Sequence, residues 1–410
     1  MNILGLIVEY NPFHFGHLHH LKTSQQITDA DITIAVMSGS FLQRGEPALT
    51  TKWKRTKMAL ENGVDIVIEL PYIFSTQKAE IFSDAAVSLL HSIGANRLCF
   101  GSEFGEIDTF STTVRKVNEH ELELNTQIKK YMSDGVSYPR GFSLAFETIF
   151  NNEDLIDLSK PNNILGYHYV KSIQKLDSTM IPSTIKREKA EYHDQDVTKG
   201  EKIASATSIR KELIERNRKL KEVQSYLPPA STTQLQNHLD EWQEFAHWEK
   251  YFPFLQHRII TATVSELHAI YECEEGLEYR LKDAMTKVNS FQTFMEEVKT
   301  KRYTWTRLQR LLVHILLNTT KEFMNEYCTP LQPSYLRLLG MSEEGRAYLS
   351  SVKKQLSVPL VTRASEWDHP ILKKDITASQ IHGLPFRISL DEEFKKIPVQ
   401  YTKEKGTFPS

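Results

Sequence analysis

The chain opens with the apolar run Ile3-Leu4-Gly5-Leu6-Ile7-Val8 and soon reaches Asn11-Pro12-Phe13-His14-Phe15-Gly16-His17, the stretch that decides the fold. The apolar run, the turn with proline and glycine, and a helical pattern from His17 to Ile27 predict a strand, a loop and a helix start. The first N–H groups of a helix lack acceptors within it, and the helix dipole favours negative charge. The stretch therefore predicts a phosphate site in an α/β domain.

The histidines of this loop suit a phosphate better than a metal ion. His14 and His17 flank Gly16, and each imidazole can donate a hydrogen bond to a phosphoryl oxygen. Gly16 lets the backbone pass close to a ligand. His19 and His20 follow, but the partner residues of an H-E-x-x-H metal helix are absent from the sequence. The loop predicts a nucleotide site without a Walker lysine.

Further short apolar runs alternate with helical patterns. We expect strands over 32–37, 64–70 and 97–100, and helices over 52–62 and 76–92. This alternation predicts right-handed crossovers and a doubly wound parallel sheet. The loops that follow Val8, Met37, Leu70 and Phe100 should then share one face with the first loop, because ligands bind at the carboxyl ends of such strands.

The chain then turns helical over 107–150, and Pro161-Asn162-Asn163 opens another helix that runs to about Lys175. Residues 179–185 predict one more strand, and its proline indicates an edge position. That strand would deliver Lys186-Arg187-Glu188 to the ligand face.

The best boundary in the sequence is Leu227-Pro228-Pro229-Ala230, because consecutive prolines end helices and stiffen linkers. We expect a catalytic domain over 1–227, a mostly helical domain over 228–400 and a polar tail over 401–410. Helical patterns cover 244–272, 277–298 and 303–324, and short closing segments follow around 358–361 and 376–381.

Composition bounds the class of protein. The chain has 410 residues with 50 Lys and Arg against 52 Asp and Glu, so a nucleic-acid surface must be a local patch. Three widely spaced cysteines, Cys99, Cys273 and Cys328, support neither a disulfide framework nor a zinc site. With no leader pattern and no apolar run long enough to span a membrane, we expect a soluble cytoplasmic protein.

A second element is Ser205-Ala206-Thr207-Ser208-Ile209-Arg210. A Ser/Thr cluster before a helix is most often an N-cap. Here the hydroxyls, the free N–H groups and Arg210 can also form a second anion cradle. Two cradles in one domain suggest a triphosphate held at both ends.

These motifs carry a family resemblance. The first, His14-Phe15-Gly16-His17, matches the HxGH signature of the nucleotidyltransferase superfamily, and the second resembles its ISSTxxR-like signature, with Ala206 where a hydroxyl is usual. More narrowly, the chain resembles the bacterial tRNA(Met) cytidine acetate ligase family over nearly its whole length. The similarity is carried by the segments 8–17, 37–45, 161–166 and 302–307.

The resemblance implies a Rossmann-like nucleotidyltransferase domain and an enzyme that activates acetate with ATP as acetyl-adenylate, releasing pyrophosphate. The acetyl group would pass to the wobble cytidine of elongator tRNA(Met), giving N4-acetylcytidine. His14 and His17 would be catalytic, at the α/β-phosphates. The implied ATP site comprises Ile7, Val8, Glu9, Tyr10, Asn11, Pro12, Phe13, His14, Phe15, Gly16, His17, His20, Gly101, Asn162, Arg187, Glu188, Ser205 and Thr207.

Several roles stay open at this point. Lys22 either reaches the β/γ-phosphates or is an exposed helical lysine, and Asn162 either reads the nucleoside or caps a helix. Gln43 and Arg44 either bind acetate or cytidine, or stabilise a turn. Mg²⁺ is expected with ATP from the phosphate charge, without an assigned ligand.

A basic segment in the helical region predicts the tRNA contact. It combines basic residues with the aromatic rings of Tyr303 and Trp305, which could stack on unpaired bases. A solvated helix face, or core packing of the aromatics, is the alternative. The basic residues are Lys299, Lys301, Arg302, Arg307 and Arg310, and a second basic cluster over 210–221 could extend the track.

Two other functions remain compatible with the HxGH signature. One is nucleotidyl transfer to a small phosphorylated metabolite, and the other is nucleotide or tRNA binding without turnover. The long helical region with its basic segment favours a macromolecular acceptor.

Overall fold

The described residues of the computed structural model are all except 137, 152–153, 188–203, 403–406 and 409–410. They form one eight-stranded sheet in the order β5-β4-β1-β2-β3-β6-β7, and β8 pairs with β6. The strands are β1 (Ile3–Val8), β2 (Ile32–Ser38), β3 (Ile66–Leu70), β4 (Arg97–Ser102), β5 (Ile181–Lys186), β6 (Leu336–Ser342), β7 (Leu360–Val361) and β8 (Val399–Tyr401).

The first five strands are parallel, as the sequence predicts. Strand β5 lies at the edge of the sheet, so the edge position predicted from Pro182 is confirmed. Strand β6 runs antiparallel to β3. The loops after β1, β2, β3 and β4 therefore leave the sheet at one end, called here the carboxyl edge.

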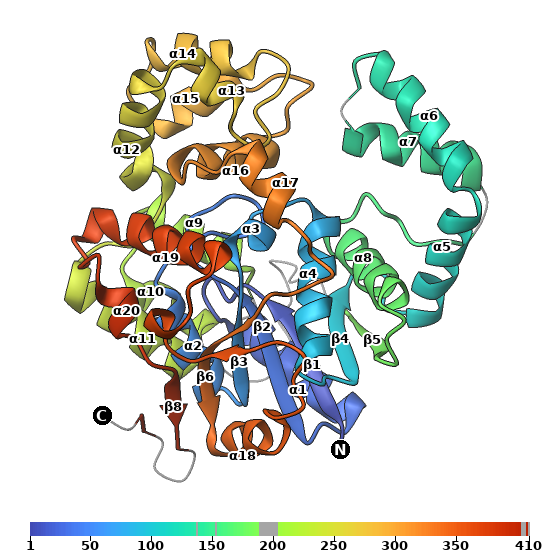
Figure 1. Cartoon of the computed structure of the whole chain (residues 1–410), viewed down its shortest axis with the longest axis vertical. Helices are drawn as coiled ribbons and strands as arrows, with labels where there is room; N and C mark the ends of the chain where they lie inside the picture. Colours follow the sequence, from blue (N-terminus) through green and yellow to red (C-terminus); the bar gives the residue numbers. More distant parts are fainter. Residues whose placement is uncertain (137, 152–153, 188–203, 403–406, 409–410) are drawn as a thin grey trace.

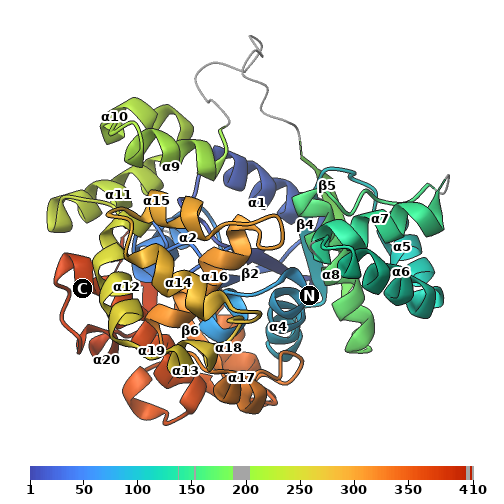
Figure 2. The ribbon, with the colours of Figure 1, turned by 90° about the horizontal axis from the view of Figure 1, so that it is seen from above.

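Helices cover both faces of the sheet because alternate residues of the buried strands point to opposite sides. Ala35 packs in one core cluster with Met58 of α2, and its neighbour Ile34 packs in the other with Leu90 of α4. Figure 2 shows α1 on one side of the strands and α4 on the other. The helices of this part are α1 (Phe15–Thr28), α2 (Lys52–Glu61), α3 (Tyr72–Ser75) and α4 (Ala79–Ser92).

An arm of three helices follows β4, and a group of helices follows β5. The arm, α5 (Ile107–Glu119), α6 (Glu121–Ser133) and α7 (Tyr138–Phe150), extends from the body beside α8 (Pro161–Lys175) (Figure 1). After β5 come α9 (Ala206–Ile214), α10 (Leu220–Val223), η1 (Gln224–Tyr226) and α11 (Pro229–Trp242).

A helical lobe rises beyond the carboxyl edge, at the upper left of Figure 1. It consists of α12 (Trp248–Thr261), α13 (Val264–His268), α14 (Leu277–Met285), α15 (Phe291–Val298), α16 (Trp305–Leu316) and α17 (Lys321–Tyr327). The closing elements besides β6 to β8 are α18 (Glu343–Val352), η2 (Ala364–Glu366), α19 (Pro370–Gly383), η3 (Leu384–Phe386) and α20 (Glu392–Lys395).

Each of the three long helical patterns predicted for this lobe is divided into two helices. The side chains of Thr263, Ser290 and Thr320 accept hydrogen bonds from backbone N–H groups and start new helices inside the apolar periodicity. A capping residue is compatible with a continuous helix in sequence, so periodicity alone predicted helices that were too long.

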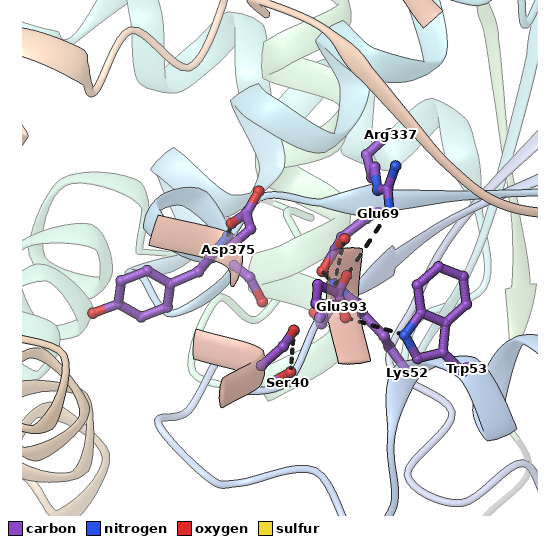
Figure 3. Close-up of polar contacts among 12 residues, drawn as sticks. Ser40, Lys52, Trp53, Glu69, Arg337, Asp375 and Glu393 are labelled. Carbon is purple, nitrogen blue, oxygen red and sulfur yellow. Dashed lines mark hydrogen bonds and ion pairs between the residues drawn. The ribbon is translucent and has the colours of Figure 1, made fainter. Parts of the chain in front are cut away.

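Strands from both sides of the predicted boundary at residue 227 share the sheet, since β6, β7 and β8 follow it. The strand β6 was not predicted. The two parts are also joined by buried charges, which Figure 3 shows: Lys52 Nζ lies 2.7 Å from Glu69 and 2.7 Å from Glu393, and Trp53 donates to Glu393 at 3.1 Å. In the described residues, no helix is long and apolar enough to cross a membrane.

Candidate nucleotide-binding site

The loop between β1 and α1 is held by buried polar contacts. Tyr10 adopts a φ of 49°, a left-handed conformation that is costly for a side chain with a Cβ. Asn11 accepts a 2.7 Å hydrogen bond from the Leu49 N–H. The fully buried Arg55 donates to the carbonyls of Glu9 (2.7 Å) and Ser38 (2.9 Å). These contacts keep the ends of β1 and β2 and the first loop in one fixed arrangement.

Three histidines gather at the start of α1. The ring centroids of His14 and His17 are 3.8 Å apart, and His14 is 5 % exposed. Burial, together with the nearby Arg187 guanidinium, lowers the pKa of His14 to about 3 and of His20 to about 4, and holds the pKa of His17 well below its usual range. All three rings are therefore neutral at pH 7, so they can meet a phosphate as N–H donors rather than as cations.

Ring atoms in this cluster lack partners within the described part of the chain. His14 Nδ1 and His20 Nε2 are buried without a hydrogen bond. Buried polar atoms are normally paired, so such atoms need an explanation. A phosphoryl group at the α1 N-terminus would satisfy them, together with the free N–H groups of the first helical turn.

A second group of the predicted site residues lies at the ends of β4 and β5. A Cβ on Gly101 would come within 3.2 Å of Arg187 Cγ and 3.7 Å of His20 Cδ2. Arg187 donates to Asn162 Oδ1 at 3.4 Å. The structure thus brings Gly101, Asn162 and Arg187 beside the histidines, whereas Glu188 lies outside the described residues.

Glu103 is a residue of this region that the sequence analysis missed. Its carboxylate accepts from the Asn162 side chain (2.6 Å) and from the backbone N–H groups of Asn162 (3.2 Å) and Asn163 (2.8 Å). It therefore fixes the start of α8 and orients the Asn162 amide. The available signal was an acidic residue directly after the strand that ends near Gly101.

The second motif docks against the first. Arg210 donates to the Asn11 carbonyl at 3.0 Å and to Glu46 Oε2 at 2.6 Å. Ser205 accepts from the Ser208 N–H at 3.1 Å and so caps α9, while Thr207 is exposed. Arg210 thus ties α9 to the first loop instead of standing free for an anion, and Ser205 has the capping role that such clusters usually have.

Two other residues of the predicted ATP site are buried in the core. Tyr10 (2 %) and Phe13 (0 %) are core side chains, so they would reach a nucleotide only through their backbone.

Lys22 lines a hollow of about 490 Å³ with Asp31 and Asn62, next to the amino ends of β2 and β3. The structure therefore places Lys22 away from the carboxyl edge, and its possible contact with the β/γ-phosphates is wrong for the geometric reason that it faces the other end of the sheet.

The two open residues of the loop between β2 and α2 differ. Gln43 is fixed by the protein, since its N–H donates to Glu9 Oε1 at 2.9 Å and its side chain donates to the Gln77 carbonyl at 2.7 Å. Arg44 is exposed. The turn-stabilising alternative thus holds for Gln43, and Arg44 is available to a substrate.

The residues of the basic segment of the helical lobe also differ in whether the protein itself supplies their partners. Arg310 is mostly buried in an ion pair with Glu272 (2.9 Å), and Arg302 pairs with Glu275 at 2.9 Å on the surface. The Arg307 guanidinium lies 5.0 Å from the ring centroid of Tyr303, which is a buried core residue. Lys299 and Lys301 are exposed.

This basic segment is coupled to the carboxyl edge. Gly45, with φ +76°, packs so closely on α16 that a Cβ would lie 2.3 Å from the Arg310 backbone N. Trp248 Nε1 donates to the Gly45 carbonyl at 3.0 Å. The lobe therefore rests directly on the loop that presents Gln43 and Arg44.

The chain has relatives over its full length. A family model described as HIGH Nucleotidyl Transferase matches residues 1–396. The chain is 47% identical over 414 residues to the tRNA(Met) cytidine acetate ligase of Bacillus subtilis, and 46% identical over 418 residues to that of Bacillus licheniformis. Each match covers 100% of this chain and 99% of the relative.

The chain is also similar to solved structures over almost its whole length. The apo crystal structure (form I) of Thermotoga maritima TmcAL is 33% identical, with a TM-score of 0.88. Another crystal structure of the same protein, bound with alpha-thio ATP, is 32% identical with the same TM-score. Each covers 98% of this chain and 100% of the matched chain.

Proposed function

Because the chain belongs to the HIGH nucleotidyl transferase family and, within it, to the tRNA(Met) cytidine acetate ligases, we propose that it is an ATP-dependent ligase. It activates acetate as acetyl-adenylate and transfers the acetyl group to the wobble cytidine of elongator tRNA(Met), which gives N4-acetylcytidine. The observation that carries this proposal is the full-length identity to relatives of that name, together with the neutral histidine cluster at the start of α1.

In the first step an acetate oxygen attacks the α-phosphorus of ATP, and the bond to pyrophosphate breaks. The protein has to position the reactants and stabilise the charge that develops on the phosphoryl oxygens. His14 and His17 donate N–H hydrogen bonds to those oxygens, and the α1 N-terminus adds its N–H groups and dipole. Arg187 supplies positive charge beside them, and Gly101 leaves room for the nucleoside.

Mg²⁺ is proposed to enter with the triphosphate. In the part of the chain that is described, no group of three or more His, Cys, Asp or Glu side chains could hold a metal ion. The phosphate oxygens and water are thus its expected ligands, which is usual for Mg²⁺ bound with a nucleotide.

In the second step the acceptor is a macromolecule that the helical lobe presents to the carboxyl edge. We propose that Lys299, Lys301, Arg302 and Arg307 contact tRNA phosphates, since they lie on the lobe that packs on Gly45. Arg310 is better explained as a structural partner of Glu272.

The test is to incubate the protein with ATP and labelled acetate, with and without tRNA, and to follow pyrophosphate and label in nucleic acid. We expect acetate-dependent pyrophosphate release and label in tRNA. Label that stays out of tRNA while AMP is joined to a small molecule would favour nucleotidyl transfer, and ATP binding without pyrophosphate release would favour a non-catalytic protein.

The same assay tests the histidines. His17→Ala should abolish acetate activation, because the donor to the developing charge is lost, while tRNA still binds. His19 is an exposed histidine of the same helix. His19→Ala is therefore the matched control and should remain active. Near wild-type activation in His17→Ala contradicts the assignment.

A further inference from the structure

Glu9 directly follows β1 and contacts Gln43, in the loop whose Gly45 packs against the helical lobe. Gly101 and Arg187 stand over β4 and β5 on one side of β1, and Gln43 and Arg44 follow β2 on the other. The Glu9 carboxylate belongs to the second side, since its Oε1 accepts from the Gln43 N–H at 2.9 Å.

The second oxygen of Glu9 is available. Within the described residues no donor is bonded to Glu9 Oε2, and Glu9 is partly exposed. One oxygen is thus held in place by a backbone N–H, while the other has no hydrogen-bond donor in the described part of the chain. A carboxylate is also a poor ligand for phosphate, because the two charges repel.

The groups around Glu9 come from four elements. Glu46 and Arg44 face it from the loop before α2, Arg210 from α9, Tyr169 from α8, and Arg55 from α2. Burial raises the pKa of Glu9 above its ordinary value; Glu46 raises it further, while the Gln43 N–H, Arg210 and Arg44 lower it. A carboxylate with a raised pKa is a stronger base near neutral pH.

The chemistry of the second step needs such a base. The N4 lone pair of cytidine attacks the acetyl carbonyl carbon, the N–C bond forms, and the C–O bond to AMP breaks with its electron pair left on the phosphate oxygen. One proton of the N4 amine has to leave. His14 and His17 are unsuited, since they face the phosphate and burial lowers the pKa of both rings.

We propose that Glu9 is the catalytic proton acceptor for the cytidine amine, with Gln43 N–H as the group that positions it. This inference rests on the proposed function, because it assigns the proton of the acetyl-transfer step. The carboxylic acid formed on Glu9 then returns its proton to water.

The experiment compares Glu9→Gln with the wild-type full chain in two assays. Acetate-dependent exchange of pyrophosphate into ATP reports activation, and single-turnover transfer of labelled acetyl to tRNA reports the second step. A positioned base typically contributes about 10²–10⁴-fold. We expect the transfer rate of Glu9→Gln to fall at least tenfold more than its exchange rate, and the rise of the transfer rate with pH to disappear.

Two further variants serve as controls. Glu9→Asp should retain the pH dependence at a reduced rate, since it keeps a carboxylate. Glu46→Gln, which removes the neighbouring charge, should also retain it. Glutamine can still accept from the Gln43 N–H, so the thermal midpoint of Glu9→Gln should stay close to that of the wild type.

Equal losses in both assays would overturn the proposal in favour of a nucleotide-site role for Glu9. An unchanged pH dependence of transfer in Glu9→Gln would overturn it as well. If the wild type releases pyrophosphate but never labels tRNA, the proposed function itself fails, and the role of Glu9 fails with it.

Discussion

Removal of the Lys52 ammonium is expected to destabilise the chain strongly. Lys52 is 2 % exposed and lies 2.7 Å from both Glu69 and Glu393, whose side chains are 3 % and 7 % exposed. Although burial lowers it, the carboxylates of Glu393 and Glu69 raise the pKa of Lys52 above its ordinary value, so Lys52 is charged at pH 7. Lys52→Met therefore removes the ammonium that lies closest to both buried carboxylates, and Glu393 keeps Arg337 at 4.0 Å. Breaking such a buried pair typically costs about 3–5 kcal/mol.

The loss can be converted into a shift of the thermal midpoint. Unfolding entropy is about 2.1 cal/mol/K per residue, or about 0.9 kcal/mol/K over 410 residues. The expected shift in Lys52→Met is then about 3–6 °C downward, measured by calorimetry at pH 7.5. At pH 5 the shift should be smaller, because the unpaired carboxylates can take up protons more readily in the folded chain.

Lys54→Met is the matched control. Lys54 pairs with Glu241, which is 50 % exposed, and such pairs contribute about 0–1 kcal/mol. In the double variant Lys52→Met, Glu69→Gln the carboxylate of Glu69 is gone, while Glu393 stays beside the buried Arg337 at 4.0 Å, so part of the stability should return. Equal midpoints for Lys52→Met and Lys54→Met, or a double variant no more stable than Lys52→Met, would refute the reasoning.

Three further predictions concern the same architecture. Burial raises the pKa of Asp375 to about 7, so its ionisation destabilises the fold increasingly as pH rises from about 4 to about 7. Over that range the thermal midpoint of Asp375→Asn should depend less on pH than that of the wild type. Parallel curves of midpoint against pH for the two proteins would contradict this. Gly45→Ala should lower the midpoint more than Gly135→Ala, since both have positive φ but only Gly45 packs on backbone; equal shifts would mean that the lobe does not depend on this contact. Reversing charge at Arg302 and Arg307 should weaken tRNA binding and reduce its salt slope by about 2, measured by filter binding; an unchanged slope would assign both to the fold.

The Lys52 cluster also explains why the two predicted domains share a sheet. Glu69 lies in β3, Lys52 begins α2, and Glu393 belongs to α20 near the end of the chain (Figure 3). Tyr335 donates to Asp375 at 2.6 Å beside it. The catalytic sheet is thus completed by residues that follow the helical lobe, so the lobe is inserted between two parts of one α/β unit.

Local patterns were sufficient for the first half of the fold. The strand, loop and helix around Asn11–His17 and the parallel order of the first strands follow from short-range periodicity, turn residues and the handedness of crossovers. The same patterns failed for β6, whose sequence Leu336–Ser342 is short and apolar and resembles a buried helix segment, and for the helix breaks at capping residues.

The sequence by itself determined that the loop Asn11–His17 stands on a strand–helix junction, because the residues that form it are neighbours in the chain. Only the tertiary structure decided how each charged side chain is used. Arg210 binds the Asn11 carbonyl and Glu46, Arg310 binds Glu272, and Lys22 faces the opposite end of the sheet. The partner of a charge depends on which distant segments the topology brings within about 4 Å, and a linear pattern does not contain that distance.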